Sequence, residues 1–74
     1  MNHDVSANLK RFREEKNLNQ EQMAELLGYS LSGYRKIEQG HRGLPIHKAL
    51  LATEILGCSL NEIFLPSNLP KMGK

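Results

Sequence analysis

Cysteine is nearly absent from this 74-residue chain, which removes the usual covalent staple of a small domain. Cys58 has no second cysteine with which to form a disulfide within the chain, and the three histidines lack the short paired spacings of zinc sites. The sequence therefore predicts no metal site and no cofactor. Helix packing or a second copy of the chain remains as the source of stability.

Long apolar runs are missing as well. The longest, residues 49–52, is far too short to cross a membrane, and the first ten residues hold no apolar segment of signal-peptide length. We therefore expect a cytoplasmic protein without a membrane partner. Tryptophan is absent, and twelve leucines stand against one valine, a composition that favours helices over strands. One all-α domain is the expected fold class.

The first two helices are predicted from apolar spacing and from residues that start and end helices. A helix of about residues 5–16 carries one apolar stripe, with Asp4 or Ser6 as its N-cap. The next begins after Asn19, a good N-cap with a glutamine three positions on, and stops at Gly28, which suits the left-handed conformation of helix ends.

Three more helices follow, and capping residues, proline or glycine mark their ends. Their predicted extents are residues 31–39 after the cap Ser30, residues from Pro45 to Gly57, and a short helix after the capping box of Ser59 and Glu62. We therefore predict one compact five-helix domain over residues 1–65. Residues 66–74, which contain two prolines, are expected to be a short C-terminal tail.

Charge is unevenly distributed along the chain. Residues 30–48 carry a net charge of +3, whereas residues 49–70 carry −2, so the overall +2 hides a basic third-helix region. Such a one-sided basic region suggests a polyanionic partner, although a solvated surface explains the charge on its own.

Helical geometry divides the third predicted helix into two faces. At roughly 100° per residue, four polar or cationic side chains and one leucine fall within an arc of about 140°. They are Leu31, Ser32, Arg35, Lys36 and Gln39. Tyr34 and Ile37 fall on the opposite side, where they would pack on the first two helices. A helix with one buried apolar stripe and one polar face can lie in the major groove of DNA.

One pattern extends over the predicted helices and their ends. It consists of Asn19-Gln20, Met23-Ala24, Leu27-Gly28, Ser30, Ile37-Glu38, Gly40, Leu56-Gly57 and Ser59-Leu60. With these residues the chain resembles the Cro/CI-type helix-turn-helix family, the lambda-repressor-like domain, over about residues 5–65. The resemblance implies a helix-turn-helix at the second and third helices. It also implies sequence-specific binding of double-stranded DNA as a homodimer, in transcription control.

The resemblance further implies where bases are read. The corresponding positions at the start of the third helix and one turn later are Leu31, Ser32 and Lys36, and Arg35 lies between them. Leu31 offers contact with a thymine methyl group, Ser32 donates or accepts a hydrogen bond, and Lys36 donates to guanine O6 or N7. Arg35 is expected to reach a base or a phosphate.

Phosphate contacts are expected on both sides of this helix. Gln20 begins the second helix, where free backbone N–H groups and the helix dipole already favour an anion. Gln39, His41 and Arg42 flank the turn after the third helix. Contacts of this kind fix the register of a protein on DNA without reading its sequence.

Two residues near the third helix call for a structural explanation. The resemblance implies that Glu38 forms an ion pair with Arg13, which would hold the first helix on the third. Gly33 lies inside the predicted helix, where glycine costs on the order of 1 kcal/mol relative to alanine. It is either a point of close approach to a partner or DNA, or a tolerated defect.

The fourth predicted helix has more apolar surface than one core requires. Ile46, Ala49, Leu50, Ala52, Thr53 and Leu56 form one broad face, and Leu51 and Ile55 lie nearly opposite. Either the fifth helix or the tail covers this second stripe, or it forms a two-fold interface with other residues. Those other residues would be Leu60, Ile63 and Leu65.

Catalysis has little support, because no nucleophile has a spaced base partner and no glycine-rich phosphate loop is present. We therefore predict a non-enzymatic, homodimeric repressor that acts at the nucleoid on a palindromic operator. The alternatives are a DNA-binding antitoxin with a toxin partner, a controller of a restriction system, or a module that binds a protein antagonist. Cys58 is expected to be a small buried hydrophobe.

Overall fold

Five α-helices make up the part of the chain that the computed structural model describes, which is the backbone of residues 2–65 and the side chains of residues 5–65. They are α1 (Asn2–Glu15), α2 (Gln20–Leu27), α3 (Leu31–Glu38), α4 (Ile46–Leu56) and α5 (Leu60–Phe64). This confirms the predicted all-α fold class. The tail predicted for residues 66–74 lies outside the described residues.

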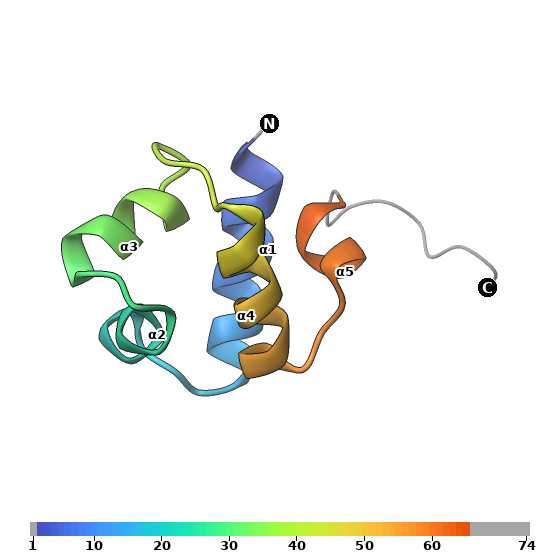
Figure 1. Cartoon of the computed structure of the whole chain (residues 1–74), viewed down its shortest axis with the longest axis horizontal. Helices are drawn as coiled ribbons and strands as arrows, with labels where there is room; N and C mark the ends of the chain where they lie inside the picture. Colours follow the sequence, from blue (N-terminus) through green and yellow to red (C-terminus); the bar gives the residue numbers. More distant parts are fainter. Residues whose placement is uncertain (1, 66–74) are drawn as a thin grey trace, which may run out of the picture.

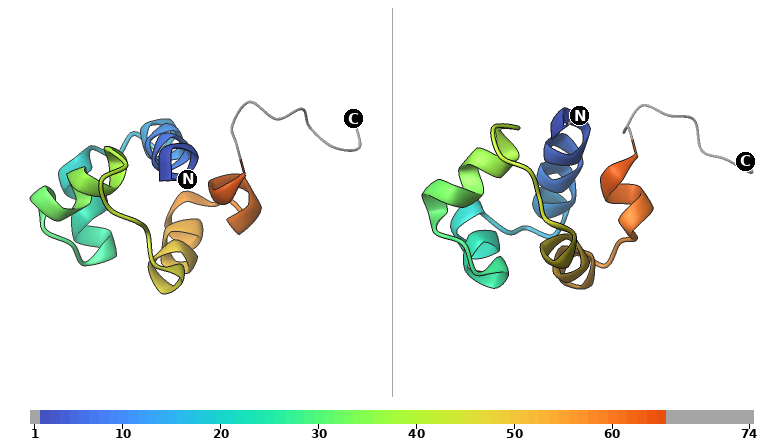
Figure 2. Two further views of the ribbon diagram at one scale, coloured as in Figure 1. Left: turned by 90° about the horizontal axis from the view of Figure 1, so that it is seen from above. Right: turned by 45° about the horizontal axis from the view of Figure 1, so that its top comes forward.

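The helices are arranged around α1. In Figure 1, α2 and α3 lie to one side of α1 and α5 lies to the other, and Figure 2 shows the same order from two further directions. α4 contacts both α2 and α5, and so links the two sides of the molecule. None of the helices described is both long and apolar enough to cross a membrane.

The ends of α2 follow from single residues, as the sequence predicts. The Asn19 side chain accepts a hydrogen bond from the Gln22 N–H at 2.7 Å, and the Gln22 side chain accepts one from the Asn19 N–H at 2.9 Å. At the other end Gly28 adopts a φ of +83°, the left-handed conformation that only glycine takes without strain. These two ends fix the length of the first helix of the helix-turn-helix.

The capping box predicted for α5 is also confirmed. Ser59 accepts from the Glu62 N–H at 3.2 Å, and the Glu62 carboxylate accepts from the Ser59 N–H at 2.8 Å. Pro45 is the N-cap of α4 rather than a residue of its first turn. Gly57 ends that helix with a φ of +68°.

The predicted start of α1 is wrong. No glycine or proline interrupts residues 2–8, so the helix continues back to Asn2, and Asp4 and Ser6 lie inside it rather than at its N-cap. Its end agrees with the prediction, because Asn17 has a φ of +60° and so breaks the helical path.

The core joins all five helices. Its buried apolar members are Leu9, Met23, Ala24, Leu27, Tyr34, Ile37, Ala52, Leu56 and Ile63. Asn8 is also fully buried, and its amide nitrogen donates to the carbonyl oxygens of Ile63 at 2.9 Å and Leu65 at 2.6 Å. α5 is therefore held on α1 by both apolar burial and two hydrogen bonds. Cys58 is half-buried and packs against the core, not within it.

Candidate nucleic-acid interface

The outward face of α3 is arranged as helical geometry predicts. The five side chains assigned to that face line one open groove on the surface of the molecule. They are Leu31, Ser32, Arg35, Lys36 and Gln39. Leu31 is half-buried and the other four are exposed, whereas Tyr34 and Ile37 are buried on the inner side. α3 therefore presents hydroxyl, amide and cationic groups to solvent over a firmly packed apolar stripe.

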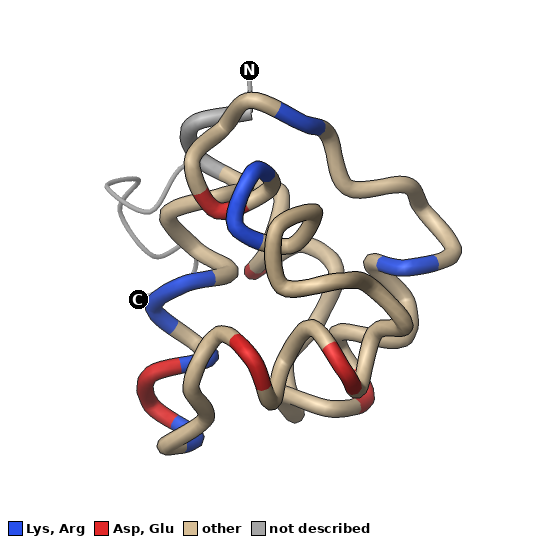
Figure 3. Tube along the Cα trace, turned by 90° about the vertical axis from the view of Figure 1, so that its left-hand side faces the viewer, with Lys and Arg blue, Asp and Glu red and all other residues tan. Residues whose placement is uncertain are grey.

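Charge is separated on the side of the molecule that carries α2 and α3. Figure 3 views this side and shows blue, basic segments in its upper part, where α3 lies, and both red and blue segments in its lower part. Glu21 and Glu25 belong to α2, and Arg35 and Lys36 belong to the last turn of α3. The basic region predicted from the sequence is thus concentrated on α3 and the loop that follows it.

A cluster of cations surrounds Tyr29, which lies in the turn between α2 and α3. The Arg42 guanidinium carbon lies 5.3 Å from the centre of the Tyr29 ring, and the Lys48 ammonium lies 5.2 Å from it. Lys48 also donates to the Leu27 carbonyl at the end of α2, at 2.5 Å. The aromatic ring thus holds both cations beside the turn. Sequence reasoning missed Tyr29 and Lys48, because their separation along the chain gave no signal of contact.

Gly33 is explained by this same region. It is buried, and an added Cβ would lie 3.1 Å from the Arg42 guanidinium and 3.2 Å from the Ser30 hydroxyl oxygen. That hydroxyl oxygen caps α3 by accepting from the Gly33 N–H at 3.1 Å. Glycine therefore allows a close approach within the chain itself, which neither of the two sequence interpretations included.

The ion pair expected between Arg13 and Glu38 is present. Arg13 Nε donates to one Glu38 carboxylate oxygen at 2.6 Å, and Nη2 donates to the other at 3.2 Å. The two side chains are only 8% and 3% exposed, so both charges lie inside the protein. Arg13 also donates to the Leu18 carbonyl at 2.6 Å, which ties the end of α1 to the start of α2.

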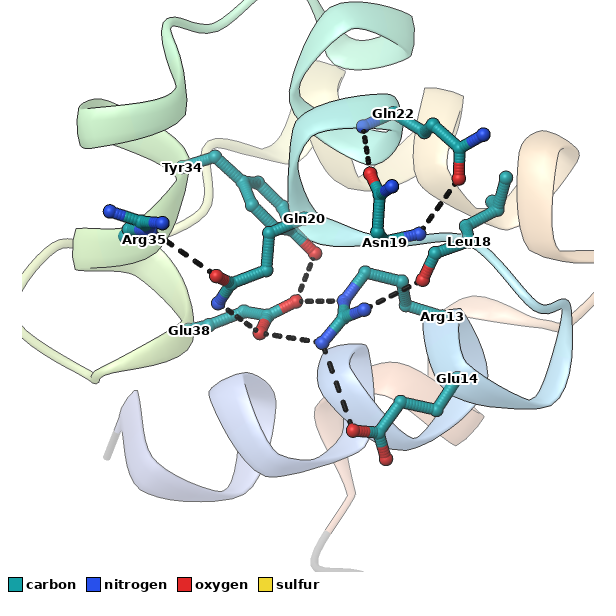
Figure 4. Close-up of polar contacts among 9 residues, drawn as sticks. All are labelled: Arg13, Glu14, Leu18, Asn19, Gln20, Gln22, Tyr34, Arg35 and Glu38. Carbon is teal, nitrogen blue, oxygen red and sulfur yellow. Dashed lines mark hydrogen bonds and ion pairs between the residues drawn. The ribbon is translucent and has the colours of Figure 1, made fainter.

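Two neutral side chains complete the surroundings of Glu38. The Tyr34 hydroxyl donates to it at 2.5 Å and the Gln20 amide nitrogen donates at 3.1 Å (Figure 4). Burial raises the pKa of the Glu38 carboxyl, but the hydrogen bonds from Arg13, Tyr34 and Gln20 outweigh burial and hold that pKa below its ordinary value. Burial, together with the hydrogen bond to Glu38, raises the pKa of Tyr34, so its hydroxyl keeps its proton.

Gln20 has a different environment from the one the sequence suggests. Its amide nitrogen is bound to Glu38, and its amide oxygen accepts from Arg35 Nε at 3.3 Å. Its side chain therefore links the ion pair to the outward face of α3 instead of pointing freely from the start of α2. Sequence reasoning found all three residues but not the contacts between them.

The residues predicted for a dimer interface differ in their exposure to solvent. Ile63 is fully buried in the core, so its assignment to an interface is wrong. Leu51 is 36% exposed and Leu65 is 51% exposed, whereas Ile55 and Leu60 are half-buried. α4 and α5 also expose apolar side chains that the prediction omitted from the interface. These are Ile46, Leu50 and Phe64, at 60%, 50% and 40% exposed.

The broad inner face predicted for α4 is too wide. Ala49, Ala52 and Leu56 are buried, but Ile46 and Leu50 point outward, and Ile55 packs against the core. Because the apolar residues of α4 are spread around its circumference, its sequence does not define the centre of the buried face. Among the described residues, no group of three or more His, Cys, Asp or Glu side chains could hold a metal ion.

Comparison with known proteins gives two findings. A solved structure described as an HTH_3 family transcriptional regulator from Vibrio cholerae is similar to this chain, with a TM-score of 0.72 and 24% sequence identity. The match covers 85% of this chain and 35% of that protein, so this chain spans about a third of its length. No curated protein matches the sequence.

The second finding is a match to the model of the helix-turn-helix family HTH_3, over residues 9–63. That range contains both helices of the turn, the ion pair and most of the core. This confirms the resemblance stated from the sequence. The chain belongs to the helix-turn-helix family HTH_3.

Proposed function

We propose that this protein is a homodimeric repressor that reads a palindromic operator by placing α3 in the major groove. The observation that carries the proposal is the division of α3 into two faces. Tyr34 and Ile37 anchor it from within, while Ser32, Arg35 and Lys36 remain accessible. A helix of about 10–12 Å diameter fits the major groove, which is about 12 Å wide.

Within the groove, each outward side chain has a distinct role. Lys36 and Arg35 donate to guanine O6 or N7, Ser32 donates or accepts at a base edge, and Leu31 contacts a thymine methyl group. Contacts to phosphate are assigned to other residues. They are Gln39, His41 and Arg42. The Tyr29 ring restricts the Arg42 guanidinium, which lowers the entropy lost when it binds a phosphate.

Dimerisation follows from the length of the reading helix. α3 has 8 residues and is about 12 Å long, so it spans only three or four base pairs at roughly 3.4 Å per step. With about 1–3 kcal/mol for each base contact, one copy cannot select a single site in a genome. The exposed apolar side chains of α4 and α5 provide the surface for a second copy. They are Ile46, Leu50, Leu51, Phe64 and Leu65, flanked by the half-buried Ile55 and Leu60.

Selection of bound sites from random duplexes with the purified protein tests this proposal. We expect a palindrome whose half-sites are centred about one helical turn of DNA apart. Lys36→Ala should lose the preference at one symmetric pair of positions and keep the fold, because Lys36 is exposed. Failure to enrich any duplex, even at low salt, would refute the proposal.

The exposed apolar side chains of α4 and α5 also support a second candidate, in which a protein antagonist or a toxin is the partner. Under that function the apolar surface binds a different protein, as in a DNA-binding antitoxin, a restriction-system controller or a protein-interaction module. Salt dependence distinguishes the protein-interaction module from the DNA-binding candidates, because binding to DNA weakens steeply as ionic strength rises and apolar association does not. Either regulator would act at the nucleoid.

A further inference from the structure

We propose that Gln20 is a positioning residue that aims the Arg35 guanidinium at a guanine, and that Glu38 fixes the orientation in which Gln20 does so. This inference rests on the proposed DNA-reading function of α3. It gives Gln20 a role in specificity rather than in general contact with phosphate.

The orientation of the Gln20 amide is determined by its partners. An ionised carboxylate can only accept hydrogen bonds, so the amide end that meets Glu38 must be the NH₂ group. That contact is 3.1 Å long, from Gln20 Nε2 to Glu38 Oε1. The Gln20 carbonyl oxygen therefore points away from Glu38, and it accepts a hydrogen bond from Arg35 Nε at 3.3 Å (Figure 4).

The carboxylate that sets this orientation is itself immobilised. Two nitrogens of Arg13 and the Tyr34 hydroxyl hold its oxygens, and the Glu38 side chain is 3% exposed. The buried carboxylate thus fixes the orientation of the Gln20 amide through one hydrogen bond, and the Gln20 amide orients the exposed Arg35 guanidinium through a second. Side chains held in their bound orientation lose less conformational entropy when the ligand arrives.

Because Arg35 Nε is bound to Gln20, the terminal nitrogens of Arg35 remain available to contact a base. Arginine has five N–H donors, and the Gln20 bond uses the single Nε donor while the two terminal nitrogens keep four. Those terminal nitrogens can donate in parallel to O6 and N7 of one guanine. Lys36, one residue on, offers a single ammonium without a fixed direction. Arg35 is therefore the side chain of this face that is built for bidentate contact.

Gln20→Met tests the inference, because methionine keeps the side-chain length but makes neither hydrogen bond. The base pair read by Arg35 is located first, by comparing the selected sites of the wild type and of Arg35→Ala. It is the base pair at which Arg35→Ala no longer prefers one base. A bidentate contact gives about 5- to 150-fold discrimination there. Gln20→Met should lower that discrimination at least about threefold and leave preferences at other positions unchanged. In the Arg35→Ala background the same substitution should have no further effect on preference.

Gln39→Met is the matched control, since it makes the same chemical change at an exposed residue of the groove that Arg35 lines. It should weaken binding to all duplexes by one factor. If Gln20→Met behaves in that way too, and does so with or without Arg35, then Gln20 is a phosphate ligand and the inference is wrong. If the wild-type protein binds no duplex at low salt, the proposed function fails and this inference fails with it.

A measurement on the free protein tests the geometry without DNA. Exchange of the Arg35 Nε proton with solvent, followed by NMR, should accelerate about 2- to 10-fold in Gln20→Met, the range expected for loss of one hydrogen bond. Thermal melts of both variants establish that each is folded at the temperature used. An unchanged exchange rate in a folded variant would overturn the inference.

Discussion

Replacing Glu38 with glutamine removes the negative charge that balances Arg13 inside the protein, while the volume of the side chain hardly changes. All four hydrogen bonds that reach Glu38 are donated to it, two from Arg13 and one each from Tyr34 and Gln20. An amide has only one acceptor oxygen, so its NH₂ group would face donors. The Arg13 charge would stay buried without a counter-charge.

The expected loss is large relative to the stability of so small a protein. Breaking a buried pair by removing one partner costs roughly 3–5 kcal/mol. A chain of this length has a free energy of unfolding of about 4–11 kcal/mol. For domains of this size each kcal/mol shifts the melting temperature by about 4–8 °C, so we expect Glu38→Gln to melt at least about 12 °C below the wild type.

Thermal and urea unfolding followed by circular dichroism measure this difference. Glu14→Gln is a matched control, because Glu14 also lies near Arg13, at 3.9 Å, but its side chain is 57% exposed. That exposed contact should contribute less than about 1 kcal/mol. Equal melting temperatures for the two variants would refute the reasoning, since burial is the property that distinguishes the two carboxylates.

Four further results are expected. The pKa of Glu38 is lowered by folding, so its stabilisation is present above the ordinary value of 4.5 and is lost as the pH falls below it; urea titrations across pH 2–7 should show this loss in the wild type and not in Glu38→Gln. Asn19→Ala should lower the free energy of unfolding by about 0.5–2 kcal/mol in urea titrations, because it removes the cap of α2. Gly28→Ala should cost roughly 1–2 kcal/mol in the same assay, since its φ is +83°. Arg42→Ala should weaken binding to all duplexes alike and reduce the slope of log affinity against log salt by about 1, as measured by filter binding.

The features predicted correctly from sequence are those that depend on neighbouring residues. Asn19 with Gln22, and Ser59 with Glu62, cap helices through contacts only three residues apart. Gly28 ends a helix through its own backbone conformation. Local chemistry of this kind is the same in most folds, and for that reason it can be inferred without the structure.

Features that depend on the packing of distant segments could not be inferred in the same way. Asn8 holds the carbonyl of Leu65, which lies 57 residues away along the chain. Tyr29 contacts Arg42 and Lys48 only because the loop after α3 and the first turn of α4 return past the turn between α2 and α3. The Arg13–Glu38 pair, also distant in sequence, was expected only because a family resemblance supplied what spacing could not.

α4 shows why a periodic pattern sometimes fails even locally. Apolar residues occur around its whole circumference, so no projection identifies the buried side. The structure buries the small Ala49 and Ala52 and leaves the larger Ile46 and Leu50 exposed. The small residues allow α4 to pack closely on the core.

Under the proposed function, α3 supports the fold on one side and recognises DNA on the other. Its inner residues Tyr34 and Ile37 are fully buried, so changes there act on stability. Lys36 faces solvent, so a change there can alter the preferred operator without unfolding the domain. Arg35 is the exception, because Gln20 connects it to the buried Glu38. Operator preference at Arg35 should therefore depend on residues that never touch DNA, whereas preference at Lys36 should depend on that side chain alone.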